Sequence, residues 1–397
     1  MKSRLQLTAV IVLLAIVFAA ETVGLRNIYT TRNPSGNDLL PRWLATRAWL
    51  TQGLSPYDPA IEQRGQGIIY GRPATKPGED LARFLYLPYA MLFYLPIALL
   101  PYSWAQAAWM TAIQFCLMGM TFVAFRLYRW SPPTWLAGLI ALWSIVGYPG
   151  ARSLLLGQLT IVMALLIAVG LWAVRERRDV LAGIFFALST AKPTLAIPLI
   201  PIIFIWSLSA RRWKLAGALA ASLIALVAFS FLVAPDWPMA VIGQAQGYTA
   251  YTEIGSVANI VTRQVFPVLG VVGEYTLSAI LVGWMLWEWW RAREDEGRRF
   301  EWAVAVTLVV TLIVSPRTGT TSQPVLYLVL IMLFARLARA RPRWASAGIV
   351  VTLAVTAIGL WALFLITVAG RIEQPPVFLP LPLGLAGALV FARTPDA

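Results

Sequence analysis

The sequence predicts an all-α membrane protein with many transmembrane helices, and three observations support this fold class. Hydrophobic residues make up 59% of the 397 residues and charged residues only 13%, and the mean hydropathy is +0.71, which is typical of a polytopic membrane protein. Apolar runs long enough to span a bilayer recur along the whole chain. The net charge of +14 lies in short Lys/Arg clusters between these runs, which indicates orientation signals and no nucleic-acid partner.

We expect about 12 transmembrane spans from these apolar runs. The first apolar run resembles a signal peptide up to Ala20, but it continues to Leu25 with only Glu21 interrupting it, so we expect an uncleaved helix. The predicted spans lie near residues 6–25, 104–125, 134–150, 158–174, 179–191, 194–209, 215–234, 266–290, 301–315, 324–338, 345–368 and 377–393.

The apolar segment 85–101 differs from these spans. It contains Pro88, Pro96 and Pro101 together with several tyrosines, a composition that suits the membrane interface better than a straight helix. We therefore predict that the segment is interfacial or re-entrant.

Whether segment 85–101 crosses the membrane decides the predicted topology. If 85–101 does not span, the clusters of Lys and Arg all fall on the side of the N-terminus, and single basic residues occupy most of the opposite turns. The positive-inside rule then predicts cytoplasmic N- and C-termini in the cell membrane. The basic clusters lie at 126–129, 175–178, 211–214, 291–299 and 336–343, and the irregular polar turns of the opposite side lie at 151–158, 191–193, 234–263 and 315–323.

Several kinds of chemistry are excluded by composition. The chain has no histidine, which removes histidine metal sites, Ser-His-Asp triads and imidazole proton transfer. Its one cysteine, Cys116, lies in an apolar run and cannot form an intramolecular disulfide. We expect neither a metal nor a cofactor.

The first extracytoplasmic loop, residues 26–103, is predicted to carry surface helices. Asp38 is placed to N-cap a helix that ends at Gly53, with Pro41 in its first turn and Arg42 available for an ion pair. Asp58 is interpreted as a structural turn residue. A carboxylate at a membrane edge is costly unless it is solvated, paired or used, so Asp38 is either this cap or a functional acid.

A set of short motifs in a fixed order is similar to a known family. The motifs are Asn37-Asp38 with Gly53 and Pro56-Tyr57-Asp58, Tyr86-Leu87-Pro88 with Leu95-Pro96 and Leu100-Pro101, Gly157-Gln158, Ala182-Gly183 with Ala191-Lys192-Pro193, and Arg211-Arg212-Trp213. Together they resemble glycosyltransferase family 87 over residues 1 to about 215. Many relatives carry a histidine late in the chain, where this sequence has none between Ser315 and Thr321.

The resemblance implies a GT-C fold over residues 1–397 and polyprenyl-phosphate-mannose-dependent transfer. A hexose, most simply mannose, would pass from a polyprenyl-phosphate donor to an extracytoplasmic glycan or glycolipid. The matching motif places the catalytic base at Asp38. Attack opposite the phosphate would invert the anomeric centre.

The phosphate of such a donor is a good leaving group, so the site needs a base and positive charge. Lys192 and Arg317 are the main phosphate-binding candidates, with a snorkelling lysine and an ordinary loop arginine as the alternatives. Gln158 is a sugar-hydroxyl ligand or a helix cap. The remaining donor-binding candidates are Arg83, Tyr86 and Arg263.

Two other functions remain open from the residues alone. A transporter or flippase for a lipid-linked or anionic substrate would also use Lys192 and Arg317, although such proteins usually show inverted repeats, which this sequence lacks. A scaffold subunit without catalysis is the third reading.

Overall fold

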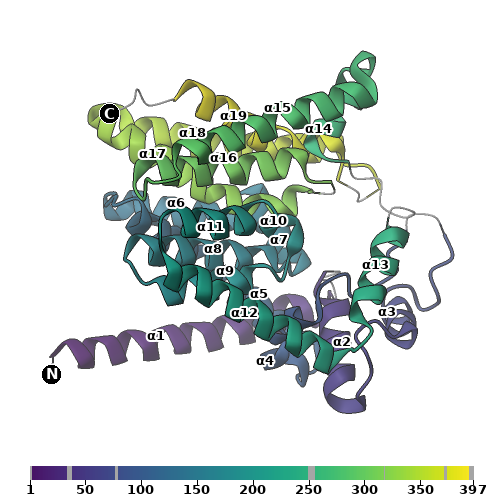
Figure 1. Cartoon of the computed structure of the whole chain (residues 1–397). Helices are drawn as coiled ribbons and strands as arrows, with labels where there is room; N and C mark the ends of the chain where they lie inside the picture. Colours follow the sequence, from purple (N-terminus) through teal and green to yellow (C-terminus); the bar gives the residue numbers. More distant parts are fainter. Residues whose placement is uncertain are drawn as a thin grey trace. The chain divides into compact units, whose positions relative to one another are not determined.

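The computed structural model describes residues 2–33, 38–76, 79–248, 255–316, 318–370 and 373–392. Helices account for 80% of the structure and none of these residues forms a β-strand, so the all-α prediction is confirmed (Figure 1). Contacts group the chain into two compact units. Unit 1 is Met1–Cys116, Leu154–Gln158 and Ala228–Thr252, and unit 2 is Leu117–Ser153, Leu159–Val227 and Glu253–Ala397.

The helices follow one another along the chain, and the connection between Tyr70 and Pro88 is a long one. The α-helices are α1 (Lys2–Leu25), α2 (Leu40–Gln52), α3 (Pro59–Tyr70), α4 (Leu95–Ala98), α5 (Tyr102–Leu127), α6 (Thr134–Val146), α7 (Tyr148–Leu156), α8 (Thr160–Arg175), α9 (Asp179–Ser189), α10 (Pro193–Ala196), α11 (Leu199–Ser209), α12 (Trp213–Val233), α13 (Trp237–Tyr248), α14 (Val257–Asn259), α15 (Gly270–Arg291), α16 (Arg298–Val314), α17 (Tyr327–Ala340), α18 (Pro342–Thr367) and α19 (Pro380–Phe391). The π-helices are η1 (Arg26–Thr30) and η3 (Ile260–Val265), and the 3-10 helices are η2 (Pro88–Phe93), η4 (Pro267–Leu269), η5 (Thr320–Leu326) and η6 (Pro375–Phe378).

Among the described residues, six helices are long and apolar enough to cross a membrane, or up to seven if the bent pair α6 and α7 is one span. The multi-span prediction is therefore supported, but the count of about 12 is not, because α8, α9 and α11 are shorter than the roughly 20 residues of a straight span. The six are Gln6–Thr30, Tyr102–Leu127, Trp213–Val233, Pro267–Arg291, Thr320–Ala340 and Pro342–Thr367.

The segment 85–101 forms no continuous helix. It folds as η2, which begins at Pro88, and the four-residue α4, which has Pro96 in its first turn. Proline lacks the N–H that a continuing helix needs and clashes with the preceding turn, so the three prolines divide the segment. Neither short helix is long enough to cross a bilayer.

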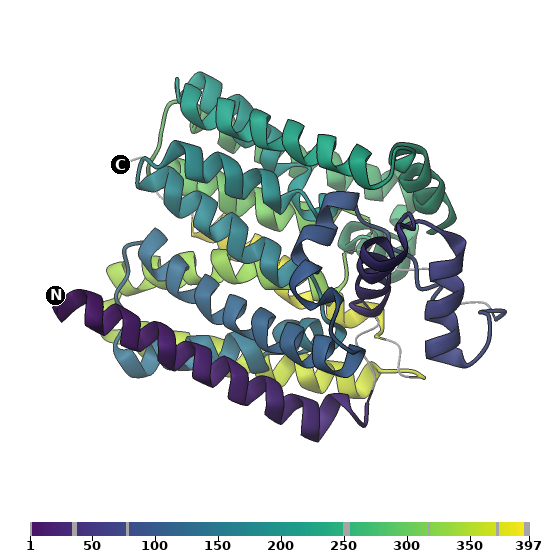
Figure 2. The same cartoon turned by 90° about the horizontal axis from the view of Figure 1, so that it is seen from below.

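In unit 1, α1 and the first half of α5 lie side by side in opposite directions (Figure 2). The rings of Phe18 and Phe115 are 5.7 Å apart at their centroids, and the Thr22 hydroxyl donates to the Thr111 hydroxyl at 3.2 Å. This pair of membrane-length helices brackets the loop that carries α2, α3, η2 and α4, which pack on one another.

The short-range features predicted for this loop, such as helix ends and turns, are confirmed with one exception. Helix α2 contains Pro41 in its first turn and ends at Gly53, whose φ of +67° needs glycine, and Asp58 caps α3 by accepting the Ala60 N–H at 2.8 Å. The N-cap prediction for Asp38 is wrong. Leu39 occupies that position without a side-chain cap, because the Asp38 carboxylate bonds elsewhere.

Unit 2 packs through small residues and buried ion pairs. A Cβ on Gly183 would lie 2.6 Å from the Leu219 backbone nitrogen, so α9 and α12 approach closely only because this residue is glycine. Directly before α12, Arg212 is paired with Asp179 and donates to the Val174 carbonyl at 2.9 Å. A buried arginine needs such partners, and this one joins α8, α9 and α12.

The predicted topology can be tested with single cysteines in a Cys116→Ser background. Gln63 in α3 and Lys214 in α12 are both exposed, so neither substitution disturbs the core. We expect a membrane-impermeant maleimide added to intact cells to label Gln63→Cys and not Lys214→Cys, because the positive-inside rule places the 211–214 cluster in the cytoplasm. Labelling of both positions from outside would contradict the topology.

Candidate functional site

Among the described residues, an amide donates a hydrogen bond to the Asp38 carboxylate of unit 1 and an arginine lies near it. Gln158 Nε2 donates to Asp38 Oδ2 at 2.6 Å, and Arg42 Nη1 lies 3.7 Å from Asp38 Oδ1. The Asp38 backbone N–H donates to the Leu156 carbonyl at 3.2 Å. The Asp38 side chain is 28% exposed, whereas that of Arg42 is 7% exposed. The carboxylate is thus held by two side chains and remains partly exposed.

Gly157 makes this arrangement possible. Its φ is +72°, and an added Cβ would lie 2.7 Å from the Cβ of Leu39, the residue next to Asp38. The Gly157 carbonyl accepts the Trp109 indole N–H at 2.9 Å, which fixes the turn against α5. Since L side chains avoid both this φ and this contact distance, the close approach of Gln158 to Asp38 depends on glycine here.

Arg42 is the buried cation of the site. Its guanidinium lies over the Tyr86 ring, 4.6 Å from the centroid, and the Tyr86 carbonyl accepts the Tyr57 hydroxyl at 2.6 Å. Burial alone lowers the pKa of Arg42, but Tyr86 and Asp38 outweigh burial and place the pKa above its ordinary value. Arg42 therefore remains a fixed positive charge beside Asp38.

Asp80 adds a second carboxylate that the sequence analysis did not single out. It lies between α3 and η2, and its Oδ1 accepts the Ala82 N–H at 2.8 Å. Burial raises the pKa of Asp80, and the Asp38 charge raises it further, while the Ala82 N–H and Arg42 act in the opposite direction. No local motif marks Asp80, because its electrostatic partner is distant in the sequence.

Arg83 belongs to a neighbouring ion pair of the same unit. Its Nε lies 3.3 Å from Glu62 Oε2, and Gln244 Nε2 of α13 donates to Glu62 Oε1 at 3.2 Å. Burial raises the pKa of Glu62 although Arg83 and Gln244 oppose this. This ion pair joins α3, α13 and the segment before η2, so Arg83 has a structural partner in addition to its predicted role.

The other predicted residues lie in unit 2 or outside the described residues. Lys192 is 9% exposed and donates from Nζ to Thr160 Oγ1 at 2.5 Å, and Pro193 begins α10 as predicted. Arg263 Nε lies 2.6 Å from Glu274 Oε2, which also accepts the Asn259 amide at 3.0 Å. Arg317 lies outside the described residues.

The unit 1 cluster holds the Asp38 carboxylate through Gln158 and Arg42 while the side chain stays partly exposed. Such a group can take a proton from a bound hydroxyl. Within the described part of the chain, no group of three or more Asp, Glu or Cys residues is arranged to hold a metal ion.

Comparison with known proteins identifies the family. The model of glycosyltransferase family 87 matches residues 84–316, more than half of the chain. The chain belongs to glycosyltransferase family 87. It is therefore a membrane glycosyltransferase, which uses a sugar donor and an acceptor. None of the curated proteins compared with the chain matches it.

The family 87 match covers some of the candidate residues and not others. Tyr86, Gln158, Lys192 and Arg263 lie inside residues 84–316, whereas Asp38 precedes them. The part of this glycosyltransferase that matches the family thus includes the hydrogen-bond donor to Asp38.

We expect Gly157→Ala to destabilise this glycosyltransferase by about 1–3 kcal/mol, because alanine disfavours a positive φ and its Cβ would displace Leu39. The matched control is Gly67→Ala in α3, where an added Cβ meets no atom within 4 Å and the free energy of unfolding should rise by about 0.5–1 kcal/mol. Thermal unfolding in detergent measures both. Equal midpoints for the two variants would contradict the role of Gly157.

The raised pKa of Asp80 gives a pH-dependent prediction. A folded-state pKa above the unfolded value means that stability is present at low pH and is lost as pH rises through the folded pKa. We therefore expect Asp80→Asn, which keeps the acceptor for Ala82, to raise the unfolding midpoint at pH 7 and to change it little near pH 4. An equal shift at both pH values would contradict the electrostatic cause.

Proposed function

We propose that this glycosyltransferase transfers a hexose, mannose in the simplest case, from a polyprenyl-phosphate donor to an extracytoplasmic glycan or glycolipid. The proposal rests on the Asp38 carboxylate, which is held by Gln158 and Arg42 and partly exposed. In this proposal the loop of residues 26–103 faces the outside of the cell membrane, where a lipid-linked donor replaces a nucleotide sugar.

Asp38 acts as the general base. It takes the proton of the acceptor hydroxyl as the hydroxyl oxygen attacks C1 of the donor sugar, and the bond between C1 and the phosphate oxygen breaks. Polyprenyl phosphate leaves with the bonding electrons, so no acid is needed on that side. Attack from the face opposite the phosphate inverts the configuration at C1.

The hydrogen bond from Gln158 and the Arg42 charge have a positioning role. Arg42 is itself buried and lies over the Tyr86 ring. The contacts of Gln158 and Arg42 fix the rotamer of the carboxylate, and its exposed part is available to the acceptor. General bases work when they lie within about 2.6–3.2 Å of the proton-bearing oxygen.

The donor phosphate requires positive charge. Lys192 is suited to it because it places an ammonium, a compact positive charge, in a buried position next to the Thr160 hydroxyl. We also propose Arg317 as a phosphate ligand, on the basis of the sequence alone. Arg83 and Arg263 contribute less, since each already pairs with a glutamate.

We expect Asp38→Asn to lower kcat by about 10²–10⁴-fold, the usual contribution of a general base. The amide is isosteric with the carboxylate and can still accept the Gln158 hydrogen bond, so the unfolding midpoint should change little. The assay is transfer from radiolabelled polyprenyl-phosphate-mannose to candidate acceptors by the protein in proteoliposomes.

Asp58→Asn is the matched control, because asparagine caps a helix as well as aspartate does and Asp58 lies in the same loop. It should retain full activity. Full activity of Asp38→Asn would exclude the base, and the absence of transfer from any lipid-linked sugar by the unmodified protein would exclude the proposed donor class.

A further inference from the structure

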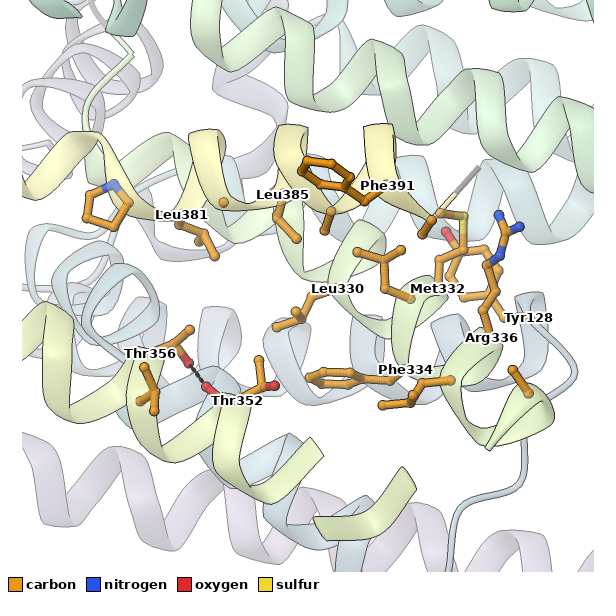
Figure 3. A pocket seen from close by; sticks show the side chains of 18 of the residues that line it. Tyr128, Leu330, Met332, Phe334, Arg336, Thr352, Thr356, Leu381, Leu385 and Phe391 are labelled. Carbon is orange, nitrogen blue, oxygen red and sulfur yellow. Dashed lines mark hydrogen bonds between the residues drawn. The ribbon is translucent and has the colours of Figure 1, made fainter. Parts of the chain in front are cut away.

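Unit 2 contains a cavity of about 1350 Å³ that is lined mainly by α17, α18 and α19, together with Tyr128 and with Arg298 and Glu301 of α16. Helix α17 forms its floor, and α18 and α19 form its two walls (Figure 3). No residue of the proposed reaction lines it. Two of the helices that line it, α17 and α18, belong to segments long enough to cross a membrane.

Most of the cavity is apolar. Leu330, Phe334 and Leu385 line its interior, and they are 4–5% exposed. Val355 and Phe391 also line it and are 63% and 90% exposed, so the cavity opens along the outer surface of α18 and α19. An apolar cavity open to the side of a membrane helix suits hydrocarbon chains.

One end of the cavity is cationic. Four arginines line this end, and the single acid among the lining residues is Glu301, which is paired with Arg175. Arg336 is fixed over the Trp302 ring at 4.5 Å, and Arg339 donates to the Tyr128 carbonyl. The four arginines are Arg298, Arg336, Arg339 and Arg341. Positive charge therefore exceeds negative charge at this end.

The cationic end coincides with one end of the helices. Arg336 and Arg339 are in the last turns of α17, and Arg341 follows it, whereas the polar segment η5 precedes the first residue of α17. Helix α17 has 14 residues and is therefore about 21 Å long, so its polar start and its cationic end are well separated. The arginines belong to the 291–299 and 336–343 clusters, which the positive-inside rule places at the cytoplasmic face.

We propose that this cavity binds an anionic phospholipid of the cytoplasmic leaflet, with its phosphate among the arginines and its acyl chains between α18 and α19. Charge complementarity selects this occupant, because basic pockets between transmembrane helices at the cytoplasmic face bind anionic headgroups. A zwitterionic lipid supplies the same chains without the net negative charge. The bound lipid fills the gap between the two helices and holds α19 against the rest of the unit.

The test measures lipid retained by the full chain after transfer from nanodiscs that contain equal amounts of phosphatidylglycerol and phosphatidylcholine, by native mass spectrometry. We expect phosphatidylglycerol adducts to dominate. Each arginine removed should lower their abundance about fivefold, which corresponds to about 1 kcal/mol per charge near the surface. The charge variant is Arg298→Gln with Arg341→Gln, both exposed. Its control is Arg293→Gln with Arg343→Gln, which are exposed and do not line the cavity.

A second variant fills the apolar part. Gly359 and Gly384 line the cavity, and an added Cβ at either meets no atom within 4 Å. Leucine at both positions should therefore fold and exclude the acyl chains. Gly283→Leu on α15 is the control, since that glycine is exposed, has equal space and lies outside the cavity.

Loss of phosphatidylglycerol adducts in both variants and retention in both controls would support the site. Equal retention of phosphatidylcholine, or equal losses in the charge variant and its control, would overturn it. Preferential retention of polyprenyl phosphate, added to the same nanodiscs as a competitor, would also overturn it and assign the cavity to the carrier.

Discussion

The hydrogen bond between Gln158 and Asp38 is the interaction on which the organisation of unit 1 depends. It joins two segments that are 120 residues apart, and it forms only because Gly157 turns the chain at a φ of +72° directly against Leu39. The same turn accepts the Trp109 indole N–H from α5. One glycine thus fixes the first loop, the end of α7 and a membrane-length helix around a single carboxylate.

Electrostatics explain why this carboxylate is tolerated in so apolar a chain. Arg42 is buried, lies over Tyr86 and faces both Asp38 and Asp80, which keep its charge in place. Asp80 in turn has a raised pKa because of burial and the Asp38 charge. These two acids and one arginine interact electrostatically, so a change at one alters the others. A neighbouring pair, Arg83 with Glu62, secures α3 to α13 through Gln244.

Local features could be predicted from the sequence, and long-range contacts could not. Hydropathy indicates an all-α membrane protein, Gly53 ends α2, Pro193 begins α10 and Asp58 caps α3, because each signal acts over a few residues. The predicted cap at Asp38 is wrong since a distant amide, Gln158, takes its carboxylate. Asp80 and the Glu62–Arg83 pair were missed for the same reason: their partners are brought together only by the tertiary fold. The span count could not be set because several apolar helices are shorter than a bilayer requires.

In the proposed reaction, Gln158 acts only through its hydrogen bond to Asp38. The most direct measurement is a double-mutant cycle on kcat for sugar transfer, with Asp38→Asn, Gln158→Ala and both together. If Gln158 only positions the carboxylate, Gln158→Ala lowers kcat in the wild-type background and has no further effect in Asp38→Asn. If the two losses of kcat add in the double variant, Gln158 and Asp38 act independently, which would contradict a positioning role for Gln158.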